Sequence, residues 1–352
     1  MMHPRRTHAT VGLAASSLLV LAGCSSTDAA ETDASSDAST GSDSTELTTV
    51  RFTLDWTPNT NHTGLYVAIA NGYFEDAGID VEVLPYNSSS AETLIDAGSA
   101  EFGITGEGGL LYAHAAGGDV VSVMSVLQHE ATALSVSADS DFTSPADLDG
   151  TTYGGFGTAT EDAVNAAVIQ AAGGTGDYDS VILGTTAYEA LYSGDVDFTQ
   201  AFVTWEGIEA DLQGTPMNYF YPTDYGFPDE YSIVVAGSES WIEENPEAAA
   251  AFVQALQEGY EYAAENPDEA AQILIDANPD VLTEEDLVLQ SQEMISADYL
   301  LDDNGEVGTQ TEAMWADLGA FYYENGLLAD ADGNALTEEP DWTEFYDADL
   351  VD

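Results

Sequence analysis

The sequence predicts an α/β fold with two lobes. Strand-like and helix-like segments alternate in two consecutive sets, residues 47–118 and 151–237, and the last third of the chain is almost entirely helical. Alternation of this kind is typical of a largely parallel sheet covered by helices on both faces. A body of about 300 ordered residues is large enough for two such lobes. We find no solenoid repeat.

The first set alternates strands with helices. Residues 47–54 and 78–86 have the apolar alternation of strands, and residues 101–105 form a short apolar strand. The helical segments carry start and stop signals, such as serine caps and terminal glycines, of which Gly72 is the clearest. The expected helices cover 62–74, 88–100 and 106–118.

The second set repeats the alternation. Its expected strands are 151–155, 180–184 and 196–203, and its expected helices are 161–174, 187–194 and 205–214. In the helical last third, Asn-Pro pairs at 245–246, 266–267 and 278–279 mark breaks between helices. We therefore expect lobe 1 over 47–144, lobe 2 over 145–236 and a return to lobe 1 with C-terminal helices over 237–352. A hinge is expected near 141–147 and 232–238.

The N-terminus resembles a bacterial lipoprotein signal. A short basic region with Arg5 and Arg6 precedes an apolar stretch of 13 residues, and "LAGC" ends at Cys24, the only cysteine of the chain. The apolar stretch is too short for a permanent membrane span. We expect a signal peptide over 1–23, a lipid on Cys24 and a disordered acidic tether over 24–46, which would anchor the protein to the outer face of the cell membrane. An ordinary secretory signal is the alternative.

Charge excludes several classes of function. The chain has 65 Asp and Glu but only 3 Lys and Arg, all of them arginine, for a formal charge of −62. A chain starting at Cys24 would keep only Arg51, which cannot make a basic surface for nucleic acid. Without lysine, a Schiff-base enzyme is also excluded. At 44% hydrophobic residues the body still folds around a core. The acidic surface suggests a salt-rich medium or a lineage bias in composition.

Metal and cofactor sites are not expected. Residues 330–341 resemble a calcium loop, but Ala335 stands where that loop needs glycine and Asp341 where it needs glutamate. Three histidines, at 62, 114 and 129, have no cysteine beside them, so a zinc site is not predicted. We expect no metal, no cofactor and no catalytic residue.

Three polar segments follow strands at the places where open α/β sheets bind ligands. "DWTPNTNH" follows the first strand, "GGFGTATED" follows the strand at 151–155, and "TWEG" follows the strand at 196–203. Each combines a flat ring or a glycine backbone with hydrogen-bonding groups. The sequence therefore predicts a ligand cleft between the lobes.

These segments also carry a family resemblance. "LDWTPNTNHTGLYVA", "YGGFGTATEDAV" and "WEGIEADLQG" resemble ABC-transporter solute-binding proteins for thiamine pyrimidine precursors, a family related to the yeast enzymes that make the pyrimidine. The resemblance implies a periplasmic-binding-protein type II fold and a ligand ring stacked on aromatics. We expect a monomer that serves an ABC permease. The yeast enzymes hold pyridoxal phosphate on a lysine, which this chain lacks. The matching positions are Asp55, Trp56, Asn59, His62, Tyr66, Gly155, Phe156, Gly157, Trp205 and Glu206.

The residue types fit a substituted aminopyrimidine. An indole stacks on a flat ring, and a carboxylate such as Glu206 accepts from an exocyclic amine. Each residue has an ordinary alternative: Trp56 and Trp205 as core aromatics, Glu206 in a solvated first turn, and His62 as a helix cap. Asp55 could be a turn residue and Tyr66 a core residue.

The expected function is that of an extracytoplasmic binding component of an ABC importer. Its expected ligand is a hydroxymethyl-aminopyrimidine or its formylamino relative. Riboflavin is a nearer rival, and a sulfonate or nitrate is a more distant one because anions call for cations or helix N-termini. An extracellular pyrimidine-processing enzyme is the alternative from another class.

Overall fold

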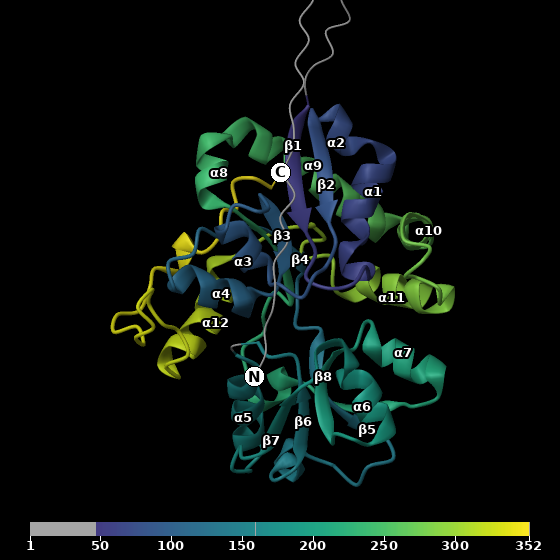
Figure 1. The fold of residues 1–352 in the computed structure, drawn as a ribbon, viewed down its shortest axis with the longest axis vertical. Coiled ribbons are helices and arrows are strands. Elements are labelled where there is room, and N and C mark those ends of the chain that lie inside the picture. The colour runs from purple at the N-terminus through teal and green to yellow at the C-terminus, as the bar shows by residue number, and fades with distance from the viewer. Residues whose placement is uncertain (1–46, 159, 352) are drawn as a thin grey trace, which may run out of the picture. The chain divides into compact units, whose positions relative to one another are not determined.

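The computed structural model describes residues 47–158 and 160–351. The predicted signal peptide, the tether and Cys24 lie outside the described residues. In the described part, ten strands form two five-stranded sheets, which Figure 1 shows as two separate groups of strands with helices around them. The predicted α/β architecture of two sheets flanked by helices is confirmed.

The first sheet has the strand order β2-β1-β3-β10-β4. Strand β1 pairs in parallel with β2 and β3, while β10 runs antiparallel to β3 and β4. The strands are β1 (Thr48–Thr53), β2 (Ile79–Leu84), β3 (Phe102–Thr105), β4 (Val121–Leu127) and β10 (Ile233–Gly237).

The second sheet repeats this topology in the order β7-β6-β8-β5-β9. Strand β6 pairs in parallel with β7 and β8, while β5 runs antiparallel to β8 and β9. The strands are β5 (Thr132–Ser137), β6 (Thr152–Gly155), β7 (Asp179–Ile182), β8 (Phe198–Phe202) and β9 (Met217–Phe220).

Both sheets are mixed, whereas the sequence predicts largely parallel ones. The antiparallel strands β5 and β10 are the ones that enter a sheet directly from the other, through the connections 128–131 and 221–232. Such strands need no crossover helix, so strand–helix alternation does not reveal them. The connections also differ from the expected boundaries and hinge: β5 belongs to the second sheet although it precedes residue 145, and β10 belongs to the first although it begins before residue 237.

Helices cover both sheets and account for most of the last third of the chain. In the first half they are α1 (Thr63–Asn71), α2 (Tyr73–Asp76), α3 (Ala91–Asp96), α4 (Glu107–Ala115) and α5 (Glu161–Ala171). The others are α6 (Ala187–Ser193), α7 (Glu206–Gln213), α8 (Glu239–Glu244), α9 (Pro246–Glu265), α10 (Pro267–Ala277), α11 (Glu285–Asp298) and α12 (Glu312–Glu324). Residues 325–351 contain turns and a single 3-10 helix, Trp342–Glu344, rather than further α-helix.

Local signals in the sequence explain several helix ends. Gly72 adopts a left-handed conformation, with φ of 79°, and ends α1. The hydroxyl of Ser90 accepts from the backbone N–H of Thr93 and caps α3. Each Asn-Pro pair before α9 and α10 places the proline at the first helical position, where its missing N–H costs nothing.

The core of the first sheet is built on stacked phenylalanines. Phe252 of α9 stacks on Phe74 and on Phe102, with ring centroids 5.2 and 4.5 Å apart, and all three rings are buried. On the other face of the sheet, Trp315 and Tyr231 belong to a second buried cluster under α4 and α12. The sheet therefore presents a buried apolar layer on both faces, as the strand composition predicts.

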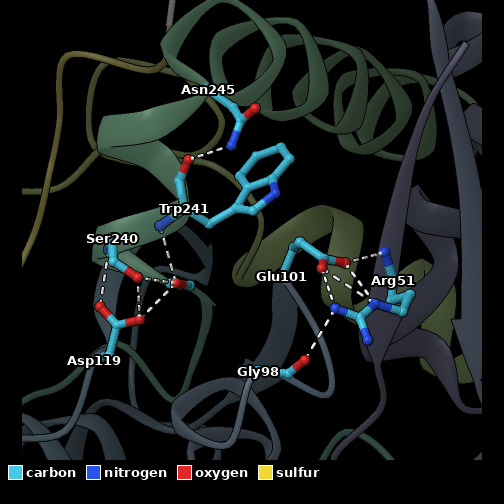
Figure 2. A network of polar contacts seen from close by, with 8 residues as sticks. Arg51, Gly98, Glu101, Asp119, Ser240, Trp241 and Asn245 are labelled. Atoms are coloured by element: carbon cyan, nitrogen blue, oxygen red, sulfur yellow. Dashed lines mark hydrogen bonds and ion pairs between the residues drawn. The ribbon is translucent and has the colours of Figure 1, made fainter.

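Arg51 is the only lysine or arginine among residues 47–351. Its guanidinium pairs with the carboxylate of Glu101 and donates to the carbonyl of Gly98 at 3.0 Å (Figure 2). The same figure shows Asp119 accepting from Ser240, where it holds the start of α8. Arg51 is thus committed to joining β1 to the start of β3 and is not free for a ligand.

Within the residues that the structure describes, no helix is both long enough and apolar enough to cross a membrane. In the same residues, no group of His, Cys, Asp and Glu side chains is arranged to hold a metal ion.

Candidate functional site

The loop after β1, residues 55–62, presents Trp56 beside the carboxyl end of the first sheet; we call it the Trp56 loop. The indole of Trp56 is half-buried. Two hydrogen bonds to helices α9 and α11 hold the loop. The hydroxyl of Tyr260 donates to the carbonyl of Asn61 at 2.6 Å, and the hydroxyl of Thr60 lies 2.6 Å from that of Ser291. A held loop with a half-exposed indole is a preformed stacking surface.

The polar residues of the Trp56 loop serve the loop itself. His62 is 0% exposed, and its Nδ1 accepts from the backbone N–H of Asn59 at 3.2 Å. A neutral ring that accepts at Nδ1 carries its proton on Nε2, which then donates to Asp55 at 2.8 Å. Asn59 accepts from the N–H of Asn61 and caps the short turn. His62 and Asn59 therefore position the loop, while Asp55, 26% exposed, keeps part of its carboxylate open.

The loop after β6, residues 156–158, presents Phe156 from the second sheet; we call it the Phe156 loop. Gly157 has φ of 84°, which only glycine adopts without strain. The buried carboxylate of Glu161 accepts from the backbone N–H groups of Phe156 and Gly157, at 3.0 and 2.6 Å, and from the hydroxyl of Tyr153 at 3.1 Å. Glu161, which the sequence prediction did not include, is what fixes Phe156.

Four half-buried rings from both sheets form an aromatic row. Trp56 lies 5.4 Å from Tyr86 and 6.0 Å from Phe156, and Phe156 lies 5.7 Å from Tyr188, measured between ring centroids. Tyr86 follows β2 and Tyr188 lies in the first turn of α6. The row brings the predicted Trp56 and Phe156 together and adds two tyrosines that the sequence analysis missed.

A cavity of about 130 Å³ lies between the two sheets. Residues of the first sheet's helices line it, among them Gly108 and Tyr322, and so do Thr158 and Glu161 from the second. Glu130 and Glu230 line it from the two connections between the sheets. The cavity is therefore a cleft between the lobes, and most of its polar groups are oxygens. None of the four rings of the aromatic row lines it; it reaches the Phe156 loop only through Thr158.

Glu206 is a buried residue that supports the aromatic row through a hydrogen bond to Tyr188. It is 4% exposed and accepts from the N–H of Phe202 at 3.1 Å and from the hydroxyl of Tyr188, whose ring contacts Phe156. Burial raises the pKa of Glu206 to about 8. A carboxyl group with this pKa can donate or accept near neutral pH.

Trp205 and Tyr66, two further predicted site residues, pack against helices α10 and α11 instead. Both are half-buried and pack against a small apolar cluster of α10 and α11 that includes Leu274 and Val288. Tyr66 also bonds to Asn278, and burial raises its pKa. Among the described residues, neither ring forms a ring–ring pair with a member of the aromatic row, so the predicted residues are gathered in two places rather than one.

Several carboxyl groups near the cleft are buried without a cation. Glu107 is 0% exposed, accepts from the N–H of Tyr231 at 2.7 Å, and has its pKa raised to about 8 by burial. The pKa of Glu230 is raised by burial and by the neighbouring Glu130. Arg51 is already paired, so no lysine or arginine of the described residues neutralises these groups. Glu107 is held by the backbone N–H of Tyr231, and burial favours the uncharged form of both Glu107 and Glu230.

Comparison with known proteins places the chain in a family. A family model described as NMT1/THI5 like matches residues 59–270. The formylaminopyrimidine-binding protein of Halalkalibacterium halodurans is 34% identical over 81% of this chain and 88% of its own length. The riboflavin-binding protein RibY of Chloroflexus aurantiacus is 29% identical over 76% of this chain and 80% of its own length.

Solved structures agree on the fold. The periplasmic aliphatic sulphonate binding protein SsuA from Escherichia coli matches with a TM-score of 0.61 at 17% identity, over 82% of this chain and 92% of that one. Its similarity concerns the fold alone. With its two mixed sheets and a cleft between them, the chain has the two-lobed periplasmic-binding-protein fold, and it belongs to the NMT1/THI5-like family.

Proposed function

We propose that this protein is the extracytoplasmic solute-binding component of an ABC importer and that it captures a small uncharged heteroaromatic, foremost a thiamine pyrimidine precursor. The observation that carries the proposal is the aromatic row, in which half-buried rings from both sheets meet through Trp56 and Phe156. A flat ring that enters between them would touch both lobes at once and would favour the closed form.

The polar groups around the row fit an aminopyrimidine. Its exocyclic amine donates and its ring nitrogens accept. Asp55, adjacent to Trp56 and partly exposed, can accept from the amine. Glu206 is 4% exposed and bonded to Phe202 and Tyr188, so it would act on a ligand only through Tyr188, whose ring it holds in the row. Asp55 would therefore hold the edge of the ligand that carries the amine.

The similarity to the formylaminopyrimidine-binding protein of Halalkalibacterium halodurans supports this ligand class. Riboflavin is the second candidate, because the chain is also similar to a riboflavin-binding protein and because a flavin ring is flat. A sulfonate or nitrate is disfavoured, since Arg51 is the only lysine or arginine among residues 47–351 and is paired with Glu101.

The remaining parts of the proposal follow from the sequence. A lipid on Cys24 would anchor a monomer to the outer face of the cell membrane, beside its permease, and the acidic surface would suit a salt-rich medium. We propose that the protein is not an enzyme: a pyrimidine synthase that holds pyridoxal phosphate on lysine is excluded by composition, and His62 is occupied at both ring nitrogens.

Calorimetric titration tests the proposal. The purified chain, in molar sodium chloride, is titrated with a hydroxymethyl-aminopyrimidine, its formylamino relative, riboflavin and taurine. We expect tight binding of a pyrimidine and no binding of taurine. Tight taurine binding with no pyrimidine binding would overturn the ligand class, and tight riboflavin binding alone would move the protein to the second candidate.

A further inference from the structure

Three helices near the cleft begin with a buried glutamate. Glu107, Glu161 and Glu206 are the first residues of α4, α5 and α7, and their side chains are 0%, 5% and 4% exposed. Each accepts a hydrogen bond from a backbone N–H outside its own helix. Glutamates that begin other helices, such as Glu239 of α8, are exposed.

Glu161 is the member of this set that lines the cavity. Its Oε1 accepts from Gly157 and its Oε2 from Phe156 and Tyr153, so both oxygens are occupied. The two backbone N–H groups and the positive end of α5 are the groups that bind phosphate and sulfonate in other proteins. Here the protein's own carboxylate takes the place of such an anion.

The backbone N–H groups of Phe156 and Gly157 could bind an anionic ligand group if Glu161 were absent. With Glu161 in place, such a group would meet a negative charge at this position. It would have to displace Glu161 or lie beside it in a cleft that also contains Glu130 and Glu230. Because Arg51 is paired with Glu101, no other lysine or arginine among the described residues offsets the repulsion. An uncharged ring meets no such penalty.

We propose that Glu161 is a specificity-determining residue that makes the cleft reject phosphate and sulfonate groups and accept the unphosphorylated form of the same ring. The inference rests on the proposed function for its ligand and adds to it the discrimination between an alcohol and its phosphate ester. Glu161 also positions Phe156, so a test must separate selectivity from structure.

The test compares the affinities of a matched ligand pair. The hydroxymethyl-aminopyrimidine and its phosphate monoester are titrated into the wild-type chain and into Glu161→Gln, Glu161→Asp and Glu239→Gln. Glu161→Gln removes the charge but keeps an acceptor oxygen, Glu161→Asp keeps the charge, and Glu239→Gln removes the same charge from an exposed helix start. Sodium chloride at 1 M reduces the Debye length to about 3 Å and removes the general repulsion of the acidic surface.

We expect the wild type to prefer the alcohol by at least about 100-fold, and Glu161→Gln to reduce this ratio by about tenfold or more. Glu161→Asp and Glu239→Gln should keep the ratio close to that of the wild type. A purely structural role for Glu161 would weaken both ligands equally, and an unchanged ratio in Glu161→Gln therefore overturns the inference. Equal binding of alcohol and ester by the wild type would overturn it as well, while leaving the proposed function in place.

Inorganic phosphate provides an arm that needs no aromatic ligand. We expect it to bind Glu161→Gln saturably and to bind the wild type, Glu161→Asp and Glu239→Gln much more weakly. If no pyrimidine binds any variant, the proposed function fails. The phosphate titration then decides by itself whether Glu161 excludes anions from the cleft. The same phosphate affinity in Glu161→Gln and Glu239→Gln would overturn it. Thermal melting of each variant confirms that it is folded at the titration temperature.

Discussion

The Trp56 loop and the Phe156 loop each present one half-buried ring to the aromatic row, but they hold it by different means. In the Trp56 loop, the acid Asp55 is hydrogen-bonded to Nε2 of His62 and remains 26% exposed. In the Phe156 loop, the acid Glu161 is 5% exposed and bonded to two backbone N–H groups and a hydroxyl.

This difference assigns the two loops different tasks. The Trp56 loop offers a ring and an accessible carboxylate, so it can both stack on a ligand and accept a hydrogen bond from it. The Phe156 loop offers a ring only, because its acid is used internally and its N–H groups are closed to anions. A ligand of the aromatic row should therefore be flat, uncharged and a donor on the side that faces Asp55.

The largest expected effect separates the two rings. Trp56→Ala should weaken pyrimidine binding by about 10- to 100-fold, or about 1.4 to 2.7 kcal/mol, because it removes the larger stacking surface of the row. Phe156→Ala should cost less, since a phenyl ring buries less area. Calorimetric titration measures both, with Tyr112→Ala, which alters an exposed residue of α4, as the control.

The melting temperature of Trp56→Ala distinguishes a site residue from a core residue. Trp56 is half-buried, so we expect little change. A large stability loss with unchanged affinity would instead assign Trp56 to the core. The Trp56 loop would then have no demonstrated role in ligand binding.

The acids of the two loops should differ in their contribution to stability. Glu161→Gln leaves at least one buried donor poorly satisfied and should lower the free energy of unfolding by about 1–2 kcal/mol. Asp55→Asn, at a more exposed position with one partner, should cost about 0.5 kcal/mol. Urea denaturation gives both values. Equal losses would show that the two acids play the same structural role.

The Phe156 loop rests on Tyr188 and Glu206, and this support should make stability depend on pH. Burial raises the pKa of Glu206 to about 8, while an exposed glutamate in the unfolded chain titrates near 4.5. Between these values the folded state binds the extra proton, so stability falls as pH rises from about 5 to about 8. We expect a loss of about 2 kcal/mol between pH 6 and pH 8 from this group.

Glu206→Gln is the variant that isolates this effect. It should flatten the fall in the free energy of unfolding over that pH range, and Asp55→Asn should not. Glu107, whose pKa is also raised to about 8 by burial, should leave a second contribution of the same sign in both variants. A wild-type chain whose stability rises between pH 6 and pH 8 would contradict the protonated state of these buried groups.

A small effect is also expected for the residue that supports the Trp56 loop through β1. Arg51→Met removes the cation that pairs with Glu101 but leaves the loop untouched. Because the Arg51 side chain is 37% exposed, we expect a loss of only about 0.5–1 kcal/mol in stability. Ligand affinity should stay unchanged, and a large loss of affinity would mean that Arg51 acts on the cleft.

The sequence carries enough information for the fold but only part of the site. Strand–helix alternation predicts most elements, because each helix that covers a sheet lies between two strands in the sequence. This alternation does not predict the antiparallel strands β5 and β10, because their partners in the sheet are distant in the sequence: β8 and β9 for β5, and β3 and β4 for β10. Trp56 and Phe156 are predictable because loops at the carboxyl ends of strands bind ligands in such folds.

Other site residues depend on tertiary packing. Tyr86 follows β2 and could have been found by the rule that identifies Trp56, whereas Tyr188 reaches the row only through the position of α6. For His62 the sequence leaves a ligand contact and a cap open, and the structure shows a buried ring with both nitrogens occupied. The role of Glu161 depends on where its oxygens point, which no spacing in the sequence reveals.

The position of a bound ligand tests the central claim most directly. A crystal structure of the chain with a hydroxymethyl-aminopyrimidine should place the pyrimidine ring within about 4 Å of the Trp56 indole, with Phe156 on the side of the second lobe and the exocyclic amine toward a carboxyl group. A ligand bound outside the aromatic row, touching neither Trp56 nor Phe156, would contradict the account.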